Sequence, residues 1–273
     1  MNIFEYNDAV KRMRGYFQDK LGYVEVPAQS RQSILAACED PATISQYIFS
    51  GINWPLPQTG QMWLEKELLE NPDLPGVFCI TTSYRNEPNP IPGRHDKIFP
   101  MFEFEGKGSW QDMVEIERGL LKHLGFYEKN SHDMTFTYDE LCGKYSTDTL
   151  DAKEEARMGD DISPIIFLTK FPLRTDPFWN MKQAGKLFNK VDVIMYGMET
   201  IGSAERSTNV EEMRHNFYTI SNGEYANLLF NHFGRRRVEL ELEEYFTYDM
   251  FQRFGGGIGL TRMTRAMRMA ELF

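Results

Sequence analysis

Several charged and aromatic side chains gather around one loop and suit a nucleotide. Arg85 and Glu87 lie at the end of a strand predicted over 77–85, Arg94 and His95 follow within the loop, and Phe99 lies in the next predicted strand. Guanidinium groups bind phosphate through paired hydrogen bonds, histidine adds a charge-assisted one, and an aromatic face can stack on a base. The pattern predicts a nucleoside triphosphate site. A solvated charged hairpin with Phe99 in the core is the alternative.

A glycine-rich stretch near the C-terminus is a second candidate for binding anions. Gly255, Gly256, Gly257 and Gly259 precede a helix predicted over 260–272, and Arg262 lies in its first turn. Glycines let the backbone approach a ligand closely, and a helix N-terminus favours negative charge. No parallel βαβ unit surrounds the stretch, so it is a weak match to a dinucleotide fingerprint. A tight strand-to-helix turn is the structural alternative.

Two carboxylates and an arginine recur at intervals of seven residues. Asp192 and Glu199 lie near the two ends of a strand predicted over 191–199, and Arg206 follows. Paired carboxylates on a sheet suit Mg²⁺ and the phosphates that it binds. Arg206 is a candidate partner for a substrate carboxylate. Isolated acids on strands are more often simply solvated, so this pattern needs support from the other two.

The composition indicates a folded, acidic chain. It has 273 residues, 40 acidic against 30 basic side chains, a formal net charge of −10, and 41% hydrophobic residues. That apolar content excludes wholesale disorder. The excess of acidic side chains argues against a protein that binds nucleic acid mainly through the negatively charged phosphate backbone. The one dense basic run, at 235–237, adjoins acidic residues and predicts a salt-bridged helix start.

The cysteines and the hydropathy pattern bear on location. Cys38, Cys79 and Cys142 are odd in number and form no CxxC pair, which is typical of a reducing compartment. The N-terminus lacks the apolar core of a signal peptide, and no uncharged apolar run reaches the ~18 residues of a membrane span. We therefore expect a soluble, cytoplasmic protein.

The predicted elements do not alternate as regular βαβ units. We expect an α+β fold, an antiparallel sheet flanked by helices, in a single domain over residues 1–273. Ser109 is the expected cap of the third helix. The predicted helices are 5–20, 60–70, 110–123, one within 222–248, and 260–272; the predicted strands are 23–27, 77–85, 98–106, 164–169, 191–199 and 216–220.

Taken together and in this order, the three patterns resemble motifs 2 and 3 of the class II aminoacyl-tRNA synthetases. The segment GYVEVP, ending at Pro27, resembles their motif 1, the helix and strand through which these enzymes form dimers. The resemblance covers residues 5–273 and is closest to the Asp/Asn branch. The segments that carry this branch assignment are CED (38–40), TGQMWLE (59–65), RHDKIF (94–99), FPLRTDPFW (171–179) and ETIGSAER (199–206). Leu64 replaces a lysine of the aspartyl pattern, so the chain looks more like the asparaginyl one.

The chain also departs from the synthetase pattern. Ile98 and Thr261 each stand where the synthetases have glutamate, and Glu205 stands where they have glutamine. The stretch GGGIGLTR is instead very like GGGIGxSR of ammonia-dependent asparagine synthetase, a relative of the synthetases that uses no tRNA.

The resemblance implies roles for individual residues. Arg85 would hold the α-phosphate and the reacting carboxylate, Phe99 would stack on adenine, and Arg206 would bind a second carboxylate or amide. The catalytic residues would be Arg85, Glu199 and Arg262, and Asp192 and Glu199 would bind Mg²⁺. ATP would be bound by Arg85, Glu87, Arg94, His95, Phe99, Asp192, Glu199, Gly257, Gly259 and Arg262, with His95 and Arg262 on the outer phosphates. The substrate would be bound by Glu39, Gln61, Glu103 and Arg206, of which the first three would surround an ammonium group.

These roles imply an ATP- and Mg²⁺-dependent ligase that releases AMP and pyrophosphate and passes an activated carboxylate to ammonia or another amine. Asp/Asn synthetases carry an N-terminal OB-fold that reads the anticodon, and a first helix starting by residue 5 leaves no room for one. We therefore expect a homodimer that amidates aspartate or an aspartate-like peptide carboxylate, without tRNA or a membrane. The alternatives are amidation of a peptide or specialised metabolite that continues to a nitrile, acyl transfer to tRNA or protein, and a non-catalytic paralogue.

Overall fold

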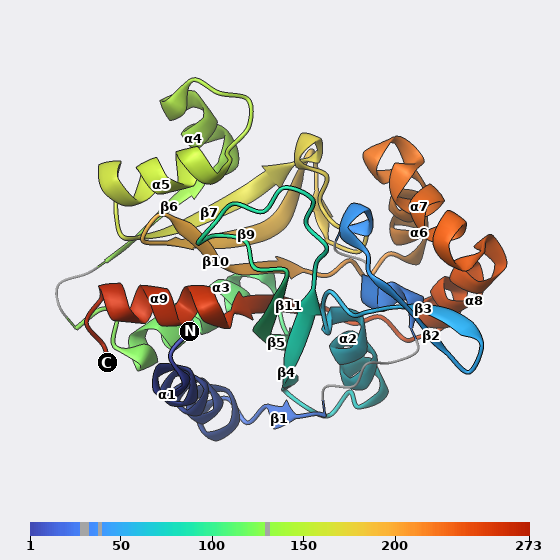
Figure 1. Cartoon of the computed structure of the whole chain (residues 1–273), viewed down its shortest axis with the longest axis horizontal. Coiled ribbons are helices and arrows are strands. Elements are labelled where there is room, and N and C mark those ends of the chain that lie inside the picture. The colour runs from blue at the N-terminus through green and yellow to red at the C-terminus, as the bar shows by residue number, and fades with distance from the viewer. Residues whose placement is uncertain (28–32, 38–39, 129–131) are drawn as a thin grey trace.

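The centre of the molecule is a large twisted sheet (Figure 1). The computed structural model describes residues 1–27, 33–37, 40–128 and 132–273. Within them the sheet has the order β1-β4-β5-β11-β10-β9-β7-β6, with β8 paired to β9. Neighbouring strands are antiparallel except for the outermost pairs, β1 with β4 and β6 with β7. The strands are β1 (Val24–Glu25), β4 (Gly76–Tyr84), β5 (Ile98–Lys107), β6 (Asp133–Thr137), β7 (Ile165–Pro172), β8 (Gln183–Ala184), β9 (Leu187–Met195), β10 (Met198–Glu205) and β11 (Arg253–Gly259).

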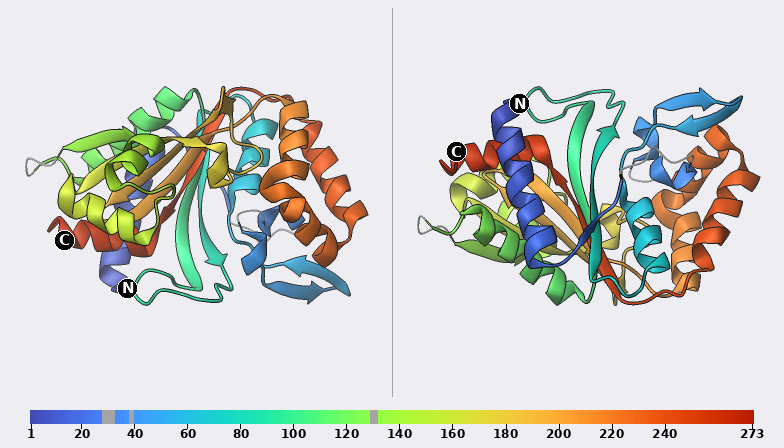
Figure 2. Two further views of the ribbon diagram at one scale, coloured as in Figure 1. Left: turned by 90° about the horizontal axis from the view of Figure 1, so that it is seen from above. Right: turned by 90° about the horizontal axis from the view of Figure 1, so that it is seen from below.

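Helices cover both faces of this sheet. On one face lie α1 (Ile3–Arg14), which continues as a π-helical turn over Gly15–Lys20, α3 (Trp110–Leu124) and α9 (Leu260–Met269). On the other face, α4 (Tyr138–Tyr145) and α5 (Ala152–Asp161) cover β7 and β9 (Figure 2). Each face of the sheet has its own hydrophobic core, because successive side chains of a strand point to opposite faces. Phe167 packs with α1, α3 and α9, and the next residue, Leu168, packs with α4 and α5. The predicted α+β fold with a mainly antiparallel sheet is therefore confirmed.

A further group of helices packs beside the β4 side of the sheet (Figure 1). It contains α2 (Gln61–Glu70), α6 (Val210–Thr219), α7 (Glu224–Phe233), α8 (Arg235–Phe246) and the separate hairpin of β2 (Gln46–Phe49) and β3 (Ile52–Pro55). The core of this group is Trp179, which is fully buried. The rings of Phe217, Tyr245 and Phe246 meet it edge-on at 5.7–6.0 Å.

Some predicted elements are wrong. Residues 216–219 belong to helix α6 rather than to a strand, because Met213 and Phe217 bury one helical face. The helix predicted within 222–248 is two helices, separated at Gly234 with φ +84°. The strand predicted over 191–199 folds back on itself. Tyr196 and Gly197 both have positive φ, as a two-residue hairpin turn requires, so Glu199 lies on β10 and not on β9.

The glycine-rich stretch is also different from its prediction. Residues 253–259 form β11, a strand in the middle of the sheet, and the turn into α9 begins only at Gly259. The sequence patterns also did not predict β2, β3, β6, β8, α4 or α5. The predicted cap at Ser109 is confirmed, since Ser109 and Asp112 form a capping box.

Two observations concern the expected location. No helix among the residues described is long and apolar enough to cross a bilayer. Cys79 and Cys142 are buried and unbridged, and Cys38 lies outside the described residues.

Candidate active site

The floor of the candidate site is a strip of glycines in the middle of the sheet. The strand register pairs Asp192 with Gly202, Gly202 with Gly257, and Gly257 with Glu103. One row across four strands therefore runs from a carboxylate over two glycines to a second carboxylate. With strands ~4.8 Å apart, the two carboxylate-bearing positions are separated by about 14 Å of bare backbone. We call the space above this strip the trough.

The next row on the same face has two changes, a lysine in place of the first carboxylate and an alanine in place of the first glycine. Lys190 pairs with Ala204, Ala204 with Gly255, and Gly255 with Glu105. A Cβ on Gly255 would lie only 1.9 Å from Glu105 Oε1. Glycine is therefore required here by the close approach of a neighbouring carboxylate.

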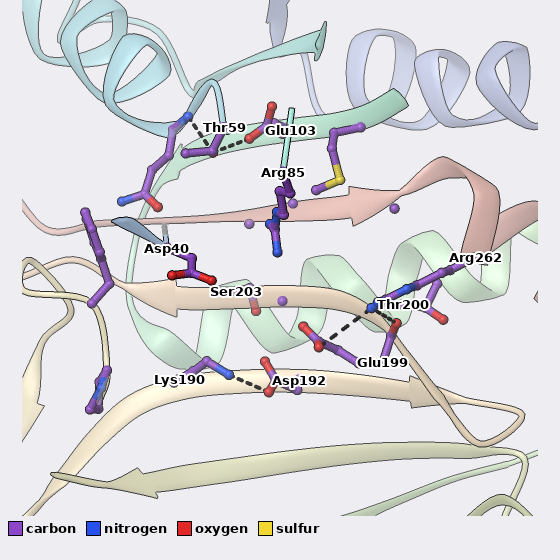
Figure 3. A pocket seen from close by; sticks show the side chains of 18 of the residues that line it. Asp40, Thr59, Arg85, Glu103, Lys190, Asp192, Glu199, Thr200, Ser203 and Arg262 are labelled. Atoms are coloured by element: carbon purple, nitrogen blue, oxygen red, sulfur yellow. Dashed lines mark hydrogen bonds and ion pairs between the residues drawn. The ribbon is translucent and has the colours of Figure 1, made fainter. Parts of the chain in front are cut away.

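A pocket of about 1010 Å³ fills the trough (Figure 3). The structure brings together around it all the predicted site residues that it describes. These are Gln61, Arg85, Glu87, Arg94, His95, Phe99, Glu103, Asp192, Glu199, Arg206, Gly257, Gly259 and Arg262. Glu39 lies outside the described residues, and its neighbour Asp40 lines the pocket.

Asp192 and Glu199 converge over Gly202 from neighbouring strands. A Cβ on Gly202 would lie 3.0 Å from Glu199 Oε1 and 3.6 Å from Asp192 Oδ1. Asp192 Oδ2 accepts a hydrogen bond from Lys190, whereas Oδ1 is buried and has no hydrogen-bond partner within the described part of the chain. Burial raises the pKa of Asp192 to about 7. Lys190 opposes this rise, whereas the nearby negative charge of Glu199 adds to it.

This pair of carboxylates fits a magnesium ion bound together with a nucleotide. Within the described residues, no group of three or more His, Cys, Asp and Glu side chains converges as a metal site. Mg²⁺ typically takes only one or two carboxylates and completes its shell with water and phosphate oxygens. The buried, unpartnered Oδ1 of Asp192 and the nearby Oε1 of Glu199 supply that donor set.

The cationic side chains reach the trough from three elements. Arg85 follows β4, and its guanidinium carbon lies 5.6 Å from the centroid of the Phe99 ring. Arg262, in the first turn of α9, donates to the Glu199 carbonyl at 2.8 Å. Arg94 pairs with Glu155 at 2.5 Å, and His95 Nδ1 accepts from the Ile91 N–H within the same loop at 3.4 Å.

The other end of the trough holds the predicted substrate acceptors. Glu103 is 2% exposed and accepts hydrogen bonds from the Gly60 N–H at 2.9 Å and from the hydroxyls of Thr59 and Thr81. Gln61 Nε2 donates to Glu65 Oε1 at 2.9 Å. These bonds fix the orientation of both acceptors beside the glycine strip.

Arg206 lies at this end, and its charge is already paired. The side chain is 3% exposed, its Nη2 lies 2.5 Å from Glu105 Oε1, and its Nε lies 3.6 Å from Glu65 Oε1. Burial raises the pKa of Glu105 to about 7, although Arg206 opposes this. Burial also acts on Glu65, but Arg253 and Arg206 outweigh it and lower the pKa of Glu65 to about 2. A substrate group at Arg206 would thus enter a network of alternating charges.

Residues 2–271 match the model of the family described as tRNA synthetases class II (D, K and N). The chain belongs to this family. Members of the family are aminoacyl-tRNA ligases that form aminoacyl-adenylates from ATP. The match extends over nearly the whole described chain, so the family assignment applies to the sheet, the trough and the flanking helices together.

Individual relatives agree with this assignment. A probable cytoplasmic asparagine–tRNA ligase of Schizosaccharomyces pombe is 25% identical in an alignment of 244 positions that covers 75% of this chain and 41% of that protein. The chain thus spans less than half of this relative. Asparaginyl-tRNA synthetase from Pyrococcus horikoshii, complexed with asparaginyl-adenylate, has a TM-score of 0.78 at 19% identity, over 99% of this chain and 67% of that one. The enzyme from Entamoeba histolytica gives 0.74 at 19%, over 98% and 64%. At these identities the structures show a common fold.

The three departures from the synthetase pattern occupy different environments. Thr261 lines the pocket beside Arg262. Glu205 is 2% exposed and accepts hydrogen bonds from Lys182, Asn189 and Gln252 at 2.6–2.8 Å, so it stabilises the end of β10. Ile98 is 63% exposed at the start of β5.

Lys190 and Glu155 are among the trough residues that were not predicted from the sequence. Lys190 lies two positions before Asp192, so strand alternation alone could have placed it on the same face. Glu155 on α5 bonds both Arg94 and the Glu199 N–H, the latter at 2.8 Å. No sequence pattern indicated Glu155, because it is far in sequence from both partners and lies on a helix that was not predicted.

Replacing Gly202 with alanine should weaken binding of a divalent ion about ten- to a hundredfold, the range for changes next to metal ligands. The added Cβ would lie between the two carboxylate oxygens and separate them. Mn²⁺ titration followed by electron paramagnetic resonance measures the affinity. Gly143→Ala is the matched control, because a Cβ there meets nothing within 4 Å. Equal Mn²⁺ affinity in the two variants would show that the metal does not bind over Gly202.

Proposed function

We propose that this chain is an AMP-forming ligase that activates the carboxylate of aspartate, or of an aspartate-like residue, and transfers the acyl group to ammonia or another amine. The observation that carries the proposal is the trough itself. It sets Arg85 opposite a convergent pair of carboxylates over bare backbone and Arg262 beside that pair, and fixed acceptors follow at one end. Nucleotide and amino acid can lie end to end on such a floor.

Activation would depend on position and charge. Phe99 would stack on the base, and Arg85 would lie over the α-phosphate, where negative charge develops as the carboxylate attacks. Asp192 and Glu199 would hold Mg²⁺, which neutralises charge on the phosphates when bound. Arg262 would bind an outer phosphate from the N-terminal turn of α9, with His95 and Arg94 contributing from the loop. Holding both reactants in line supplies much of the rate.

The acyl substrate would be held by acceptors and one buried cation. Glu103 and Gln61, with Glu39, would surround its ammonium group, and Arg206 would bind the second carboxyl or carboxamide oxygen. These assignments extend the family resemblance to the pocket lining, in which the described members of the set lie together.

Charge around the site supports a small, uncharged or cationic nucleophile. Ten carboxylate side chains line the pocket against six of lysine and arginine. Arg235 pairs with Glu239 at 2.8 Å, and Arg237 donates to the Asn53 carbonyl and packs on Trp54. Much of the densest basic run therefore stabilises the fold. A second candidate, acyl transfer to tRNA, is favoured by the names of the relatives, which are tRNA ligases.

The decisive experiment supplies Mg·ATP and ammonium with a panel of amino acids and aspartyl peptides. We expect release of AMP and pyrophosphate with aspartate or an aspartyl peptide, and an amide product by mass spectrometry. Formation of ADP and phosphate would contradict an acyl-adenylate. A parallel reaction with total tRNA separates the two candidates, because acylated tRNA without free amide would favour the second. A cytoplasmic location is part of this proposal.

We further expect a two-fold homodimer through α1 and β1. Ile3 and Phe4 on α1 are 73% and 78% exposed, and Val24 on β1 is 42% exposed. Burying such a self-complementary apolar surface favours association. Phe4→Asp should shift the protein to monomer in sedimentation velocity at micromolar concentration. Ile52→Asp, at the exposed β2–β3 hairpin, is the control and should leave the dimer intact. A monomeric wild-type protein would refute the interface.

A further inference from the structure

Lys190 occupies a position on the trough that the roles above leave unused. It lies two residues before Asp192 on β9, and its ammonium bonds Asp192 Oδ2. The same nitrogen lies 3.8 Å from the centroid of the Phe171 ring, and the side chain is 22% exposed. The ammonium is therefore held at the side of the pocket, opposite Arg85 (Figure 3).

Two other cations of the pocket, Arg94 and Arg206, are paired with carboxylates that lie outside the proposed metal site. Arg94 pairs with Glu155, which also accepts the Glu199 N–H. Arg206 makes contacts of 2.5 and 3.2 Å to Glu105. These pairs can persist when the site fills, because none of the proposed ligands needs Glu155 or Glu105.

The partner of Lys190 is different. Asp192 bonds Lys190 through Oδ2 only, and its Oδ1 is buried without a partner in the described structure. The same oxygen lies with Glu199 Oε1 around Gly202. Asp192 and Glu199 are thus the two lysine- or arginine-paired carboxylates of the described trough that a divalent ion would also claim, since Glu199 Oε2 lies 3.7 Å from Arg262 Nη1. Arg262 already has a role at the outer phosphates, whereas Lys190 has none.

A divalent ion at Asp192 changes the electrostatic balance for Lys190. The ion takes up the negative charge that now compensates the ammonium, and the two cations repel each other. A lysine has a flexible stem and three donors, so its ammonium can turn to a new acceptor at small cost. The space open to it is the trough, where anionic oxygens of the nucleotide and of the acyl substrate would meet.

We propose that Lys190 is a further catalytic residue, whose ammonium leaves Asp192 when a divalent ion binds and donates to an anionic oxygen at the reacting centre, across the trough from Arg85. This rests on the proposed function for the identity of the ligand. The ammonium forms no covalent bond. It contributes charge and a hydrogen bond to a phosphate or carboxylate oxygen.

The test measures binding of AMP and of L-aspartate by calorimetry, each with saturating Mg²⁺ and with a chelator. Lys190→Met should weaken at least one of these ligands roughly ten- to a hundredfold with Mg²⁺, the range for a charge-assisted hydrogen bond, and less than about threefold without it. Loss confined to AMP identifies a phosphate oxygen as acceptor, and loss confined to aspartate identifies a carboxylate. Adenosine, which has no phosphate, should bind equally to both proteins.

Two variants and a metal titration complete the design. Lys190→Arg should restore most of the Mg²⁺-dependent affinity, because it keeps the charge. Lys182→Met is the matched control, since Lys182 pairs with Glu205 at 2.8 Å and does not line the pocket. Lys190→Met should still bind Mn²⁺. Loss of Mn²⁺ binding would overturn the proposal, because Lys190 would then only position Asp192.

Other outcomes are equally decisive. Unchanged AMP and aspartate affinities in Lys190→Met, or equal losses with and without Mg²⁺, would overturn the role of Lys190. Wild-type protein that binds AMP but releases none from ATP with any carboxylate would contradict the proposed function alone, and the Lys190 comparison would still be measured.

Discussion

Arg85→Ala should lower the rate of AMP formation by two to three orders of magnitude, which is the loss on removing one preorganised donor from a site of developing charge. Arg85 lies at the end of β4, over the trough, beside Phe99. Its guanidinium would contact the α-phosphate while charge moves from the attacking carboxylate to the leaving pyrophosphate. Pyrophosphate release under saturating ATP measures the effect.

The interpretation requires that the variant stays folded. Arg85 does not belong to the hydrophobic clusters, so the melting temperature should change by only a few degrees. Arg236→Ala, on the exposed side of α8, is the control and should keep full activity. Activity of Arg85→Ala within tenfold of wild type would show that the nucleotide binds elsewhere.

Glu65→Gln should cost about 3–5 kcal/mol of the free energy of unfolding, the range for breaking a buried ion pair by removing one partner. Glu65 and Arg253 are both fully buried and lie 2.7 Å apart. Glu65 also accepts from Tyr245 at 2.6 Å and from Asn180 at 2.7 Å. The variant would leave the Arg253 charge uncompensated inside the protein. Urea unfolding at pH 7 measures the loss.

The pH dependence gives this prediction a second measurement. Burial notwithstanding, Arg253 and Arg206 lower the pKa of Glu65 from 4.5 to about 2. A lowered pKa stabilises the folded state above pH 4.5, and this contribution is lost as the pH falls from 4.5 towards 2. Glu65→Gln should lack that part of the acid destabilisation. The surface pair of Arg235 and Glu239 is the control, because an exposed ion pair contributes little and Glu239→Gln should leave the free energy of unfolding nearly unchanged. A similarly small loss in Glu65→Gln would refute the argument.

Glu65 also connects stability to the site. It pairs with Arg253 behind the trough and lies 3.6 Å from Arg206 at its acyl end. The same buried carboxylate that stabilises the helical group against the sheet therefore orients the cation proposed to bind the substrate. Substitutions at Glu65 should alter substrate affinity as well as unfolding.

The sequence by itself determined the family and the fold class, and it named residues that the structure places around one pocket. Short segments such as 94–99 and 199–206 are enough for this, because residues close in sequence share one strand or one loop in any fold that contains them. Arg85 and Phe99 lie together because β4 and β5, which the sequence predicts as a hairpin, are adjacent antiparallel strands. Their roles remain predictions.

Only the tertiary structure decided what surrounds these residues. The stretch 255–257 is a strand because it pairs with β10 and β5 on its two sides, and its glycines are needed because neighbours such as Glu105 leave no room for a Cβ. Neither requirement is local in sequence. Arg206 bonds Glu105, which is 101 positions away in sequence. A side chain that looked like a free cation in the sequence is therefore one half of a buried ion pair. Strand alternation places Lys190 on the same face as Asp192, but the unpartnered oxygen of Asp192 and its approach to Glu199 were visible only once β9 and β10 lay side by side. Local spacing sets which side chains share a face, whereas compensation of charge depends on desolvation and on contacts between distant segments.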